Sequence, residues 1–399
     1  MKKVLLLGGA HFQIPAIKKV KEMGHYAITC DYLPNNPGHK FADEYHNVST
    51  TDKDAVLELA RKLKVDGVVG FANDYSAVTQ AYVSEKLGLC SNPYESIETL
   101  TNKDKFRKFL SENGFCTPKA MGFDNAEEAK AHLHEFKFPV LIKPADAAGS
   151  KGVSILNDPA DLSVRVDHAL RYSLKKRFVI EEYIENDGPQ VEVEAFSING
   201  KLAFSFFMGE FFCFEEDHKM DILAESAPSA REHEIREKFN AILQKIFDLL
   251  NLRTGVYDVE ARIDKSVNIY LVEFNARNGG NLIHKIVEYS TGVDEAKFIV
   301  KAALGEDCSF IKDAKPQGFW SNYVIRSFSG GRLKGFVIDS AFEKENLVEF
   351  ETPFKPGDIV EPFSKSRTPL STMVVKFGSM EEMLYKIEHM DKFIRAEFE

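Results

Sequence analysis

A lysine at the end of an apolar strand, followed by a loop of small residues, is the strongest chemical signal in the sequence. The segment reads Lys143-Pro-Ala-Asp-Ala-Ala-Gly149-Ser150-Lys151-Gly152-Val153. Such a loop can lay backbone N–H groups and the Ser150 hydroxyl against phosphate oxygens. The Walker A pattern G-x-x-x-x-G-K-[ST] is absent. Taken alone, residues 149–152 are equally well explained as a surface turn.

A second signal is a group of oxygen-bearing side chains on two neighbouring predicted strands. Glu273 and Asn275 are two residues apart, so they share one face of a strand, and Glu260 on the next strand can meet them there. Facing carboxylates are unfavourable unless a cation lies between them. Oxygen ligands from Glu, Glu and Asn, completed by phosphates and water, suit Mg²⁺. The alternative is that these are solvated strand residues.

The elements that position these groups begin with an alternation of strands and helices. Periodicity predicts strands at residues 4–7, 26–30 and 67–71 and helices at 14–23, 54–63 and 76–87, as in a doubly wound parallel α/β unit. Gly8-Gly9-Ala10-His11 lacks the remaining glycines of G-x-G-x-x-G, which argues against an NAD site. Asp31 and Asp74 follow strands, where carboxylates either touch substrate or cap loops.

Further along the chain, strands mix with fewer helices, which predicts an α+β part. A charged helix is expected at residues 103–113 with Thr101 as its N-cap. Strands are expected at residues 138–143, 177–183, 191–198 and 202–207, the last two joined by an Asn-Gly turn. A helix at 231–250 and a strand pair at 255–262 and 269–274 follow.

Length and composition limit the class of protein. A chain of 399 residues exceeds one hydrophobic core, so two or three subdomains with a cleft between them are expected. The net charge of −10 gives no general attraction to nucleic acid or anionic lipid. Five scattered cysteines without C-x-x-C spacing favour a reducing cytosol over a disulfide framework or a zinc site. No window approaches the roughly 18 apolar residues of a membrane span, and residues 4–7 fit a first strand better than a signal peptide.

In this order, the motifs resemble the ATP-grasp family, above all its carboxylate–amine ligases and its carbamoyl-phosphate-synthase-like branch. The first family lysine opens a helix, as Lys103 does in Asn102-Lys103-Asp-Lys-Phe-Arg107, with Lys105 as its rival. The second precedes a Gly-rich lid, as Lys143 does. A hinge strand that holds adenine matches Val179-Ile180-Glu181-Glu182-Tyr183-Ile184. The magnesium ligands match Glu260, Glu273 and Asn275.

The resemblance assigns roles to single residues. The nucleotide-binding positions it implies are Lys103, Lys143, Gly149, Ser150, Lys151, Gly152, Glu181, Glu182, Ile184 and Gln190. Gln190 stands where a ribose-binding glutamate is frequent, and Glu192 and Glu194 are the nearby substitutes, expected in the opposite phase of the strand. Arg277 is the expected catalytic residue, holding the carboxylate or the tetrahedral oxyanion. A salt bridge to Glu273 or Glu260 is its alternative role.

The resemblance also implies the architecture. A Rossmann-like α/β domain that precedes the ATP-grasp fold is expected at residues 1–100. The ATP-grasp domain follows at 101–305, with a mobile lid at about 118–185. A small mixed α+β segment at 306–399 completes the fold.

The implied activity is that of a cytoplasmic ligase that uses ATP and Mg²⁺, or Mn²⁺, to convert a carboxylate into an acyl phosphate and couple it to an amine. Its partners are small-molecule carboxylate and amine substrates, with a homodimer as the expected assembly and no nucleic acid or membrane. The alternatives are a carboxylase acting through carboxyphosphate, a nicotinamide-dependent oxidoreductase and a catalytically silent ATP-binding regulator. The sequence does not identify the acid and amine substrates. Candidates to line their pocket are Glu210, Asp217, His218 and Arg326.

Overall fold

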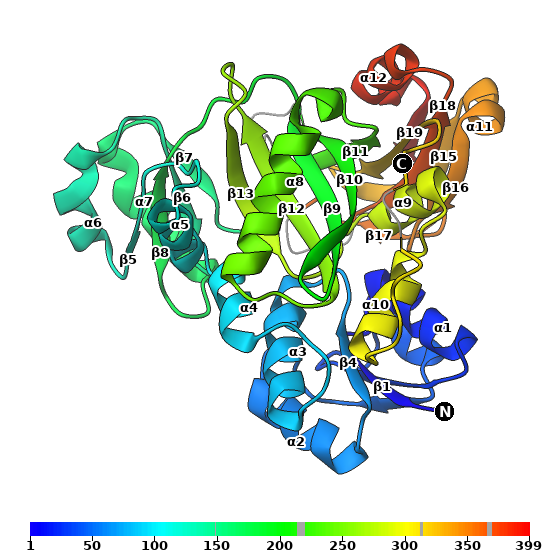
Figure 1. Ribbon diagram of the computed structural model, residues 1–399. Helices are drawn as coiled ribbons and strands as arrows, with labels where there is room; N and C mark the ends of the chain where they lie inside the picture. Colours follow the sequence, from blue (N-terminus) through cyan, green and yellow to red (C-terminus); the bar gives the residue numbers. More distant parts are fainter. Residues whose placement is uncertain (148, 214–219, 312–313, 365–368) are drawn as a thin grey trace.

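The computed structural model describes residues 1–147, 149–213, 220–311, 314–364 and 369–399. In Figure 1 the N-terminal part (blue) carries its own sheet, the next part (cyan to green) stands to one side, and a large central sheet continues into the C-terminal part (orange and red). Over the described ranges no helix is both long and apolar enough to cross a membrane.

The N-terminal sheet is parallel and has four strands in the order β3-β2-β1-β4. Its strands are β1 (Lys3–Leu7), β2 (Tyr26–Cys30), β3 (Glu44–His46) and β4 (Gly67–Gly70), and its helices are α1 (Ile14–Glu22), α2 (Lys53–Leu63), α3 (Asp74–Leu87) and α4 (Tyr94–Thr101). Nearly every residue of β1 and β4 is buried because helices cover both faces of a parallel sheet. The predicted parallel α/β unit is confirmed.

Helix α4 was not predicted, and it changes the start of the next helix. Thr101 is the last residue of α4. The N-cap of α5 (Lys103–Glu112) is Asn102, whose side-chain oxygen accepts a hydrogen bond from the Lys105 N–H at 3.1 Å. The prediction of Thr101 as N-cap was therefore wrong by one residue.

After α5 comes a separate antiparallel sheet in the order β5-β8-β6-β7, here called the lid sheet. It consists of β5 (Ala120–Phe123), β6 (Val140–Pro144), β7 (Ser154–Leu156) and β8 (Phe178–Glu182), covered by α6 (Ala126–His132) and α7 (Leu162–Tyr172). Its own hydrophobic cluster joins the strands to both helices, so this layer has an independent core.

The central sheet has eight strands in the order β13-β12-β9-β10-β11-β14-β18-β16. It begins with β9 (Gln190–Ile198), β10 (Lys201–Phe212), β11 (Ile222–Ala227), β12 (Gly255–Ile263) and β13 (Ile269–Asn275), with the helices α8 (Glu232–Leu249), α9 (Ile283–Thr291) and α10 (Glu295–Ala303). Val191 and Val193 of β9 pack in one cluster with Phe239 and Leu243 of α8. Because side chains alternate along a strand, the even-numbered residues of β9 lie on the other face.

The C-terminal part completes the central sheet. It contains β14 (Phe319–Ile325), β15 (Gly331–Ile338), α11 (Ser340–Glu345), β16 (Leu347–Glu351), β17 (Ile359–Val360), β18 (Ser371–Phe377), α12 (Met380–Glu388) and β19 (Ile394–Phe398). Strands β14, β16 and β18 extend the central sheet, and β17, β15 and β19 form a small sheet of their own. One hydrophobic cluster joins Val4, Phe206 and Trp320, so packing crosses the boundaries at residues 100 and 305, which stay predictions.

Candidate active site

A cleft lies between the lid sheet and the central sheet, and it collects most of the predicted site residues. Its lining includes Lys103, Lys143, Ser150, Glu181, Glu182, Ile184, Gln190, Glu260 and Glu273. Asn275 lines a neighbouring pocket that shares Glu273 as a wall. Gly149 and Gly152 flank Ser150 in the loop after β6, and Ala148 lies outside the described residues.

Lys103 enters the cleft from the first turn of α5. Its backbone N–H donates to the Ala145 carbonyl at 2.9 Å, and its Nζ donates to the Ala147 carbonyl at 3.0 Å and to Glu273 Oε1 at 2.9 Å. Burial lowers the pKa of Lys103, but the Glu273 carboxylate more than offsets this, so the net pKa is raised. Lys105 instead lies at the surface beside Glu98, which favours Lys103 over its rival.

Lys143, Glu181 and Arg107 form a buried ionic cluster at the back of the cleft. Lys143 Nζ and Arg107 Nε each bind one oxygen of the Glu181 carboxylate, the latter at 2.9 Å. Burial opposes ionisation of Glu181, yet Arg107 and Lys143 lower its pKa to about 2. Burial, with Arg107 nearby, lowers the pKa of Lys143 despite Glu181. Sequence reasoning gave Arg107 no role, although it lies one helical turn after Lys103.

The small-residue loop after β6 has the backbone conformation that its composition suggests. Gly149, Ser150 and Gly152 have φ angles of +62°, +54° and +73°. A Cβ atom on Gly152 would lie 2.7 Å from Pro144 Cγ, so glycine is required there for two reasons. Lys151 is half-buried beside it.

The predicted hinge residues are tied into the framework. The Glu182 carboxylate accepts the Lys137 N–H at 2.9 Å, and its own N–H donates to the Lys119 carbonyl at 2.9 Å. The Ile184 carbonyl accepts from Arg262 Nη1 at 2.8 Å. These contacts fix the chain that crosses from the lid sheet to the central sheet.

The three predicted metal ligands lie together on adjacent strands. Glu260 of β12 faces Glu273 of β13 in register, and Asp258 faces Asn275. Burial and the nearby Glu273 charge raise the pKa of Glu260 to about 8. Burial also opposes ionisation of Glu273, but Lys103 outweighs it and lowers the pKa. Facing carboxylates beside an amide oxygen are a donor set that fits Mg²⁺.

Gln190 belongs to the same face. Its Nε2 donates to Glu210 Oε2 at 2.5 Å and to Glu260 Oε2 at 3.1 Å, and its Oε1 accepts from Arg262 Nε at 3.1 Å. Glu192 and Glu194 lie on the same face of β9 as Gln190, because residues two and four positions along a strand share a face. The prediction that they lie in the opposite phase was wrong.

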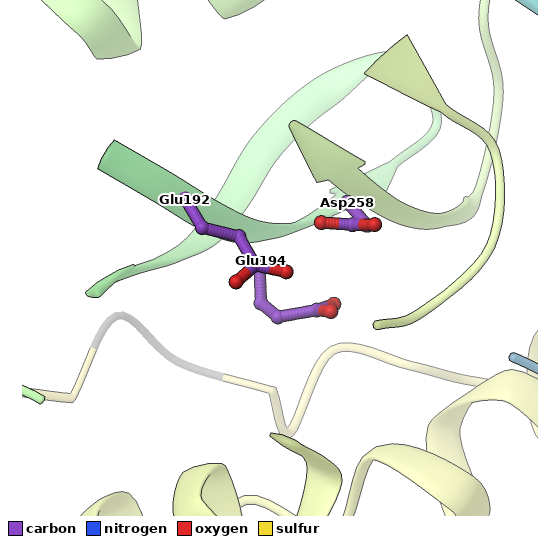
Figure 2. Close-up of side chains that lie close together, drawn as sticks. All are labelled: Glu192, Glu194 and Asp258. Atoms are coloured by element: carbon purple, nitrogen blue, oxygen red, sulfur yellow. The ribbon is translucent and has the colours of Figure 1, made fainter. Parts of the chain in front are cut away.

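Glu192, Glu194 and Asp258 form a second acidic group. The sequence indicated the two glutamates only as substitutes for Gln190 and did not predict their grouping with Asp258. Each offers a carboxylate oxygen within 4.8 Å of the others, and Figure 2 shows the two β9 side chains gathering beside Asp258 from β12. Burial, then Asp258 for Glu192 and Glu295 for Glu194, raises the pKa of both glutamates. The signal in the sequence was the alternation Gln190-Val-Glu-Val-Glu194 on one strand.

Arg277 joins this face to the N-terminal part. Its Nε donates to Asp74 Oδ1 at 2.5 Å, and its Nη1 binds Asp258. Burial opposes its charge, but Asp74 and Asp258 hold the pKa of Arg277 well above its usual value. Its ion pairs are therefore with these two residues, and the predicted alternative of Glu273 or Glu260 was wrong.

The remaining candidate residues differ in whether they reach the site. Asp31 caps a loop, accepting from the Gly9 N–H at 3.0 Å and from Asn36 Nδ2 at 2.8 Å, whereas Asp74 reaches the site through Arg277. Glu210 is buried next to Gln190, and the Arg326 guanidinium lies 4.9 Å from the centre of the Phe363 ring. Asp217 and His218 lie outside the described residues.

Comparison with known proteins places this site in a class. Residues 136–285 match the family described as the ATP-grasp domain, which confirms the resemblance that the motifs predicted. It is 24% identical over 310 residues to a formate-dependent phosphoribosylglycinamide formyltransferase from Prochlorococcus marinus strain NATL2A, covering 76% of this chain and 77% of that one.

Two further similarities support the predicted carbamoyl-phosphate-synthase-like branch and the predicted fold. The chain is 25% identical over 313 residues to the carbamoyl phosphate synthase large chain of Thermotoga petrophila, which covers 78% of this chain but only 27% of that much longer one. The L-amino acid ligase from Bacillus licheniformis superimposes with a TM-score of 0.81 at 20% identity, covering 100% and 99% of the two chains. At that identity the superposition shows the fold, and it confirms the predicted mixed α/β architecture.

Proposed function

We propose that the chain is an ATP-dependent ligase that activates a carboxylate as an acyl phosphate and couples it to an amine, releasing ADP and phosphate. The observation that carries the proposal is the meeting of Lys103 and Lys143 with the facing acids Glu260 and Glu273 in one cleft. The names of the relatives, a formate-dependent formyltransferase, a carbamoyl phosphate synthase and an amino acid ligase, support the same chemistry.

In the first step an oxygen of the substrate carboxylate attacks the γ-phosphorus of ATP, and the bond from that phosphorus to ADP breaks. Lys103 and Lys143 offset the charge of the phosphates in a partly dry cleft. Positioning and electrostatics supply most of the catalysis in phosphoryl transfer, so no side-chain nucleophile is needed. Glu260, Glu273 and Asn275 would hold Mg²⁺, which neutralises phosphate charge when bound.

In the second step the amine attacks the carbonyl carbon of the acyl phosphate, the C–N bond forms and phosphate leaves. Arg277 is the residue we assign to the substrate carboxylate or the oxyanion, and Asp74 and Asp258 fix its guanidinium in place. The hinge residues Glu181, Glu182 and Ile184 are assigned to adenine, and Gln190 to the ribose. The loop of Gly149, Ser150, Lys151 and Gly152 is assigned to the phosphates.

The test is a phosphate-release screen of small carboxylic acids and amines, singly and in pairs, followed by isotope tracing. An acid labelled with ¹⁸O in its carboxyl group must transfer one labelled oxygen to the released phosphate, because that oxygen bridges carbon and phosphorus in the acyl phosphate. Release with bicarbonate alone would make the chain a carboxylase. ATP binding without release in any pair would make it a regulator.

Compartment and assembly belong to the same proposal. We assign the enzyme to the cytosol and expect a homodimer acting on small molecules. Sedimentation analysis of the purified chain checks the assembly, and a monomer at working concentration contradicts it.

A further inference from the structure

The group of Glu192, Glu194 and Asp258 has acceptors that no donor among the described residues satisfies. All three side chains are at least 97% buried. Within the described part of the chain, Glu192 Oε2, Glu194 Oε2 and Asp258 Oδ1 have no hydrogen-bond partner. Buried carboxylate oxygens are rarely left without a donor, because the desolvation penalty is then uncompensated.

Two other oxygens of this group, one on Glu194 and one on Asp258, are held by specific donors. The Gly279 N–H binds Glu194 Oε1, and Arg277 Nη1 binds Asp258 Oδ2. A Cβ atom on Gly279 would lie 2.6 Å from Glu194 Oε1, so only glycine permits this approach. One oxygen of each of these two carboxylates is thus fixed by the protein, while the second is presented without a donor.

The surroundings add more negative charge. Glu225 and Glu295 are also buried, and each has an Oε2 atom without a partner in the described ranges. The charges of Glu225 and Asp258 act on Glu192, and those of Glu295 and Asp258 act on Glu194. A buried acidic group of this size is stabilised either by protonation, which the raised pKa values favour, or by a bound cation.

We propose that Glu192, Glu194 and Asp258 bind the ammonium group of the amine substrate. A primary ammonium has three N–H donors. The group presents three oxygens without partners among the described residues, and each of its residues brings a carboxylate oxygen within 4.8 Å of the others. Asp258 also holds Arg277, the residue assigned to the substrate carboxylate or oxyanion, so the amine is held beside the carbonyl it attacks. The bound ammonium first gives one proton to a carboxylate of the group, which frees the nitrogen lone pair for the attack. This inference rests on the proposed function and narrows its second substrate to a cationic primary amine.

A single positive charge fits this place better than a second divalent ion. The Arg277 guanidinium already lies against Asp258 and offsets part of the negative charge of the group, which leaves less of it to hold a divalent ion. Directed N–H donors also suit carboxylates whose second oxygens already accept N–H groups.

Binding is measured directly by thermal shift, with methylammonium chloride as the probe and tetramethylammonium chloride, which has no N–H donor, as the ionic-strength control. Methylammonium should raise the melting temperature of the wild-type chain above that in the control salt. Glu192→Gln and Glu194→Gln should weaken its apparent affinity at least tenfold. The matched control is Glu232→Gln on α8, whose carboxylate pairs with Arg236 at 2.8 Å, and it should behave as wild type. A cooperative melt shows that each variant is folded.

Two outcomes overturn the proposal. Equal shifts with methylammonium and tetramethylammonium would show that no N–H recognition occurs. A Mn²⁺-induced shift without nucleotide that Glu194→Gln abolishes and Glu273→Gln keeps would identify a metal site instead.

Turnover gives a second, separate measurement. Hydroxylamine is uncharged at neutral pH and traps an acyl phosphate as a hydroxamate. In Glu192→Gln and Glu194→Gln, KM for the amine found in the phosphate-release screen should rise at least tenfold more than KM for hydroxylamine, and equal rises contradict the assignment. Failure of the proposed function would appear differently, because the wild-type enzyme would then form no hydroxamate. The thermal shift with methylammonium would still test the ammonium site in that case.

Discussion

The two lysines of the cleft are each held against a carboxylate, Lys103 against Glu273 and Lys143 against Glu181. An incoming polyphosphate must therefore share these cations with acids already present. The carboxylates position both lysines in a buried place where an isolated ammonium is costly. They raise the pKa of Lys103 but only partly offset the burial that lowers the pKa of Lys143.

Replacing either lysine by alanine should weaken ATP affinity or slow turnover at least tenfold, about 1.4 kcal/mol. Lys105→Ala, on the same helix but at the surface beside Glu98, is the control and should leave ATP titrations unchanged. Wild-type ATP kinetics in both Lys103→Ala and Lys143→Ala would contradict the assignment of these lysines to the ATP site.

Arg107 offers a prediction about stability. Arg107→Ala leaves the buried Glu181 with one partner fewer, so the free energy of unfolding should fall by about 3 kcal/mol. Arg177→Ala, whose pairs with Asp104 and Asp124 are partly exposed, should cost at most about 1 kcal/mol. Urea denaturation measures both, and equal losses would show that burial does not set the difference.

At this scale the sequence predicted the residues whose spacing is local. Glu273 and Asn275 share a face because they are two apart, and Lys103 follows a helix cap. Arg107 and the pairing of Arg277 with Asp74 were not predictable in the same way. Their partners lie 74 and 203 positions away in the sequence, and only the folded chain brings them together.

Among the elements, the loop that joins β6 to β7 is the one expected to respond to nucleotide. Its residues Gly149, Ser150 and Gly152 lie in left-handed backbone conformations, and Ser150 lines the cleft. A loop that closes over phosphates gains backbone hydrogen bonds when they bind.

Hydrogen exchange should therefore slow for a peptide covering residues 149–153 when ATP and Mg²⁺ are added. A peptide from the middle of β9, which is already paired on both sides, should change little. Identical exchange of the loop peptide with and without nucleotide contradicts its role as a lid.

Strands and helices were predicted well where periodicity is strong, as in β9, β12 and α8. Helix α4 was missed, and with it the correct N-cap Asn102. The order of the central sheet was beyond sequence reasoning, because β14, β16 and β18 enter it from the last part of the chain. Such long-range pairing depends on the whole fold and leaves no local pattern.

On the scale of the whole molecule, one face of the central sheet gathers more buried carboxylates than cations. Burial first, and then neighbouring charges, raises the pKa of Glu260 to about 8. Burial likewise raises the pKa of Glu225 and Glu295 to about 7, from ordinary values of 4.5. The folded chain thus binds more protons than the unfolded chain between about pH 4.5 and 8.

Stability without ligands should consequently fall as pH rises from about 5 to 8, by linkage. Burial lowers the pKa of His284 from 6.5 to about 4, so this group makes stability rise with pH below pH 6.5. Its single contribution is opposed by those of Glu225, Glu260 and Glu295. Glu225→Gln should flatten the slope of melting temperature against pH. A slope that rises with pH in the wild-type chain contradicts this account of the acidic face.

The central claim is that Glu260, Glu273 and Asn275 hold Mg²⁺ against the phosphates of ATP. Thermal melts with ATP, with and without Mg²⁺, in the wild-type chain and in Glu273→Gln and Glu260→Gln test it most directly, with Glu112→Gln, an exposed acid on α5, as the surface control. We predict that both site variants fold, that they lose the Mg²⁺-dependent part of the ATP stabilisation, and that their turnover falls at least about a hundredfold. If both keep the full Mg²⁺- and ATP-dependent shift together with wild-type turnover, the metal lies elsewhere and the account is contradicted.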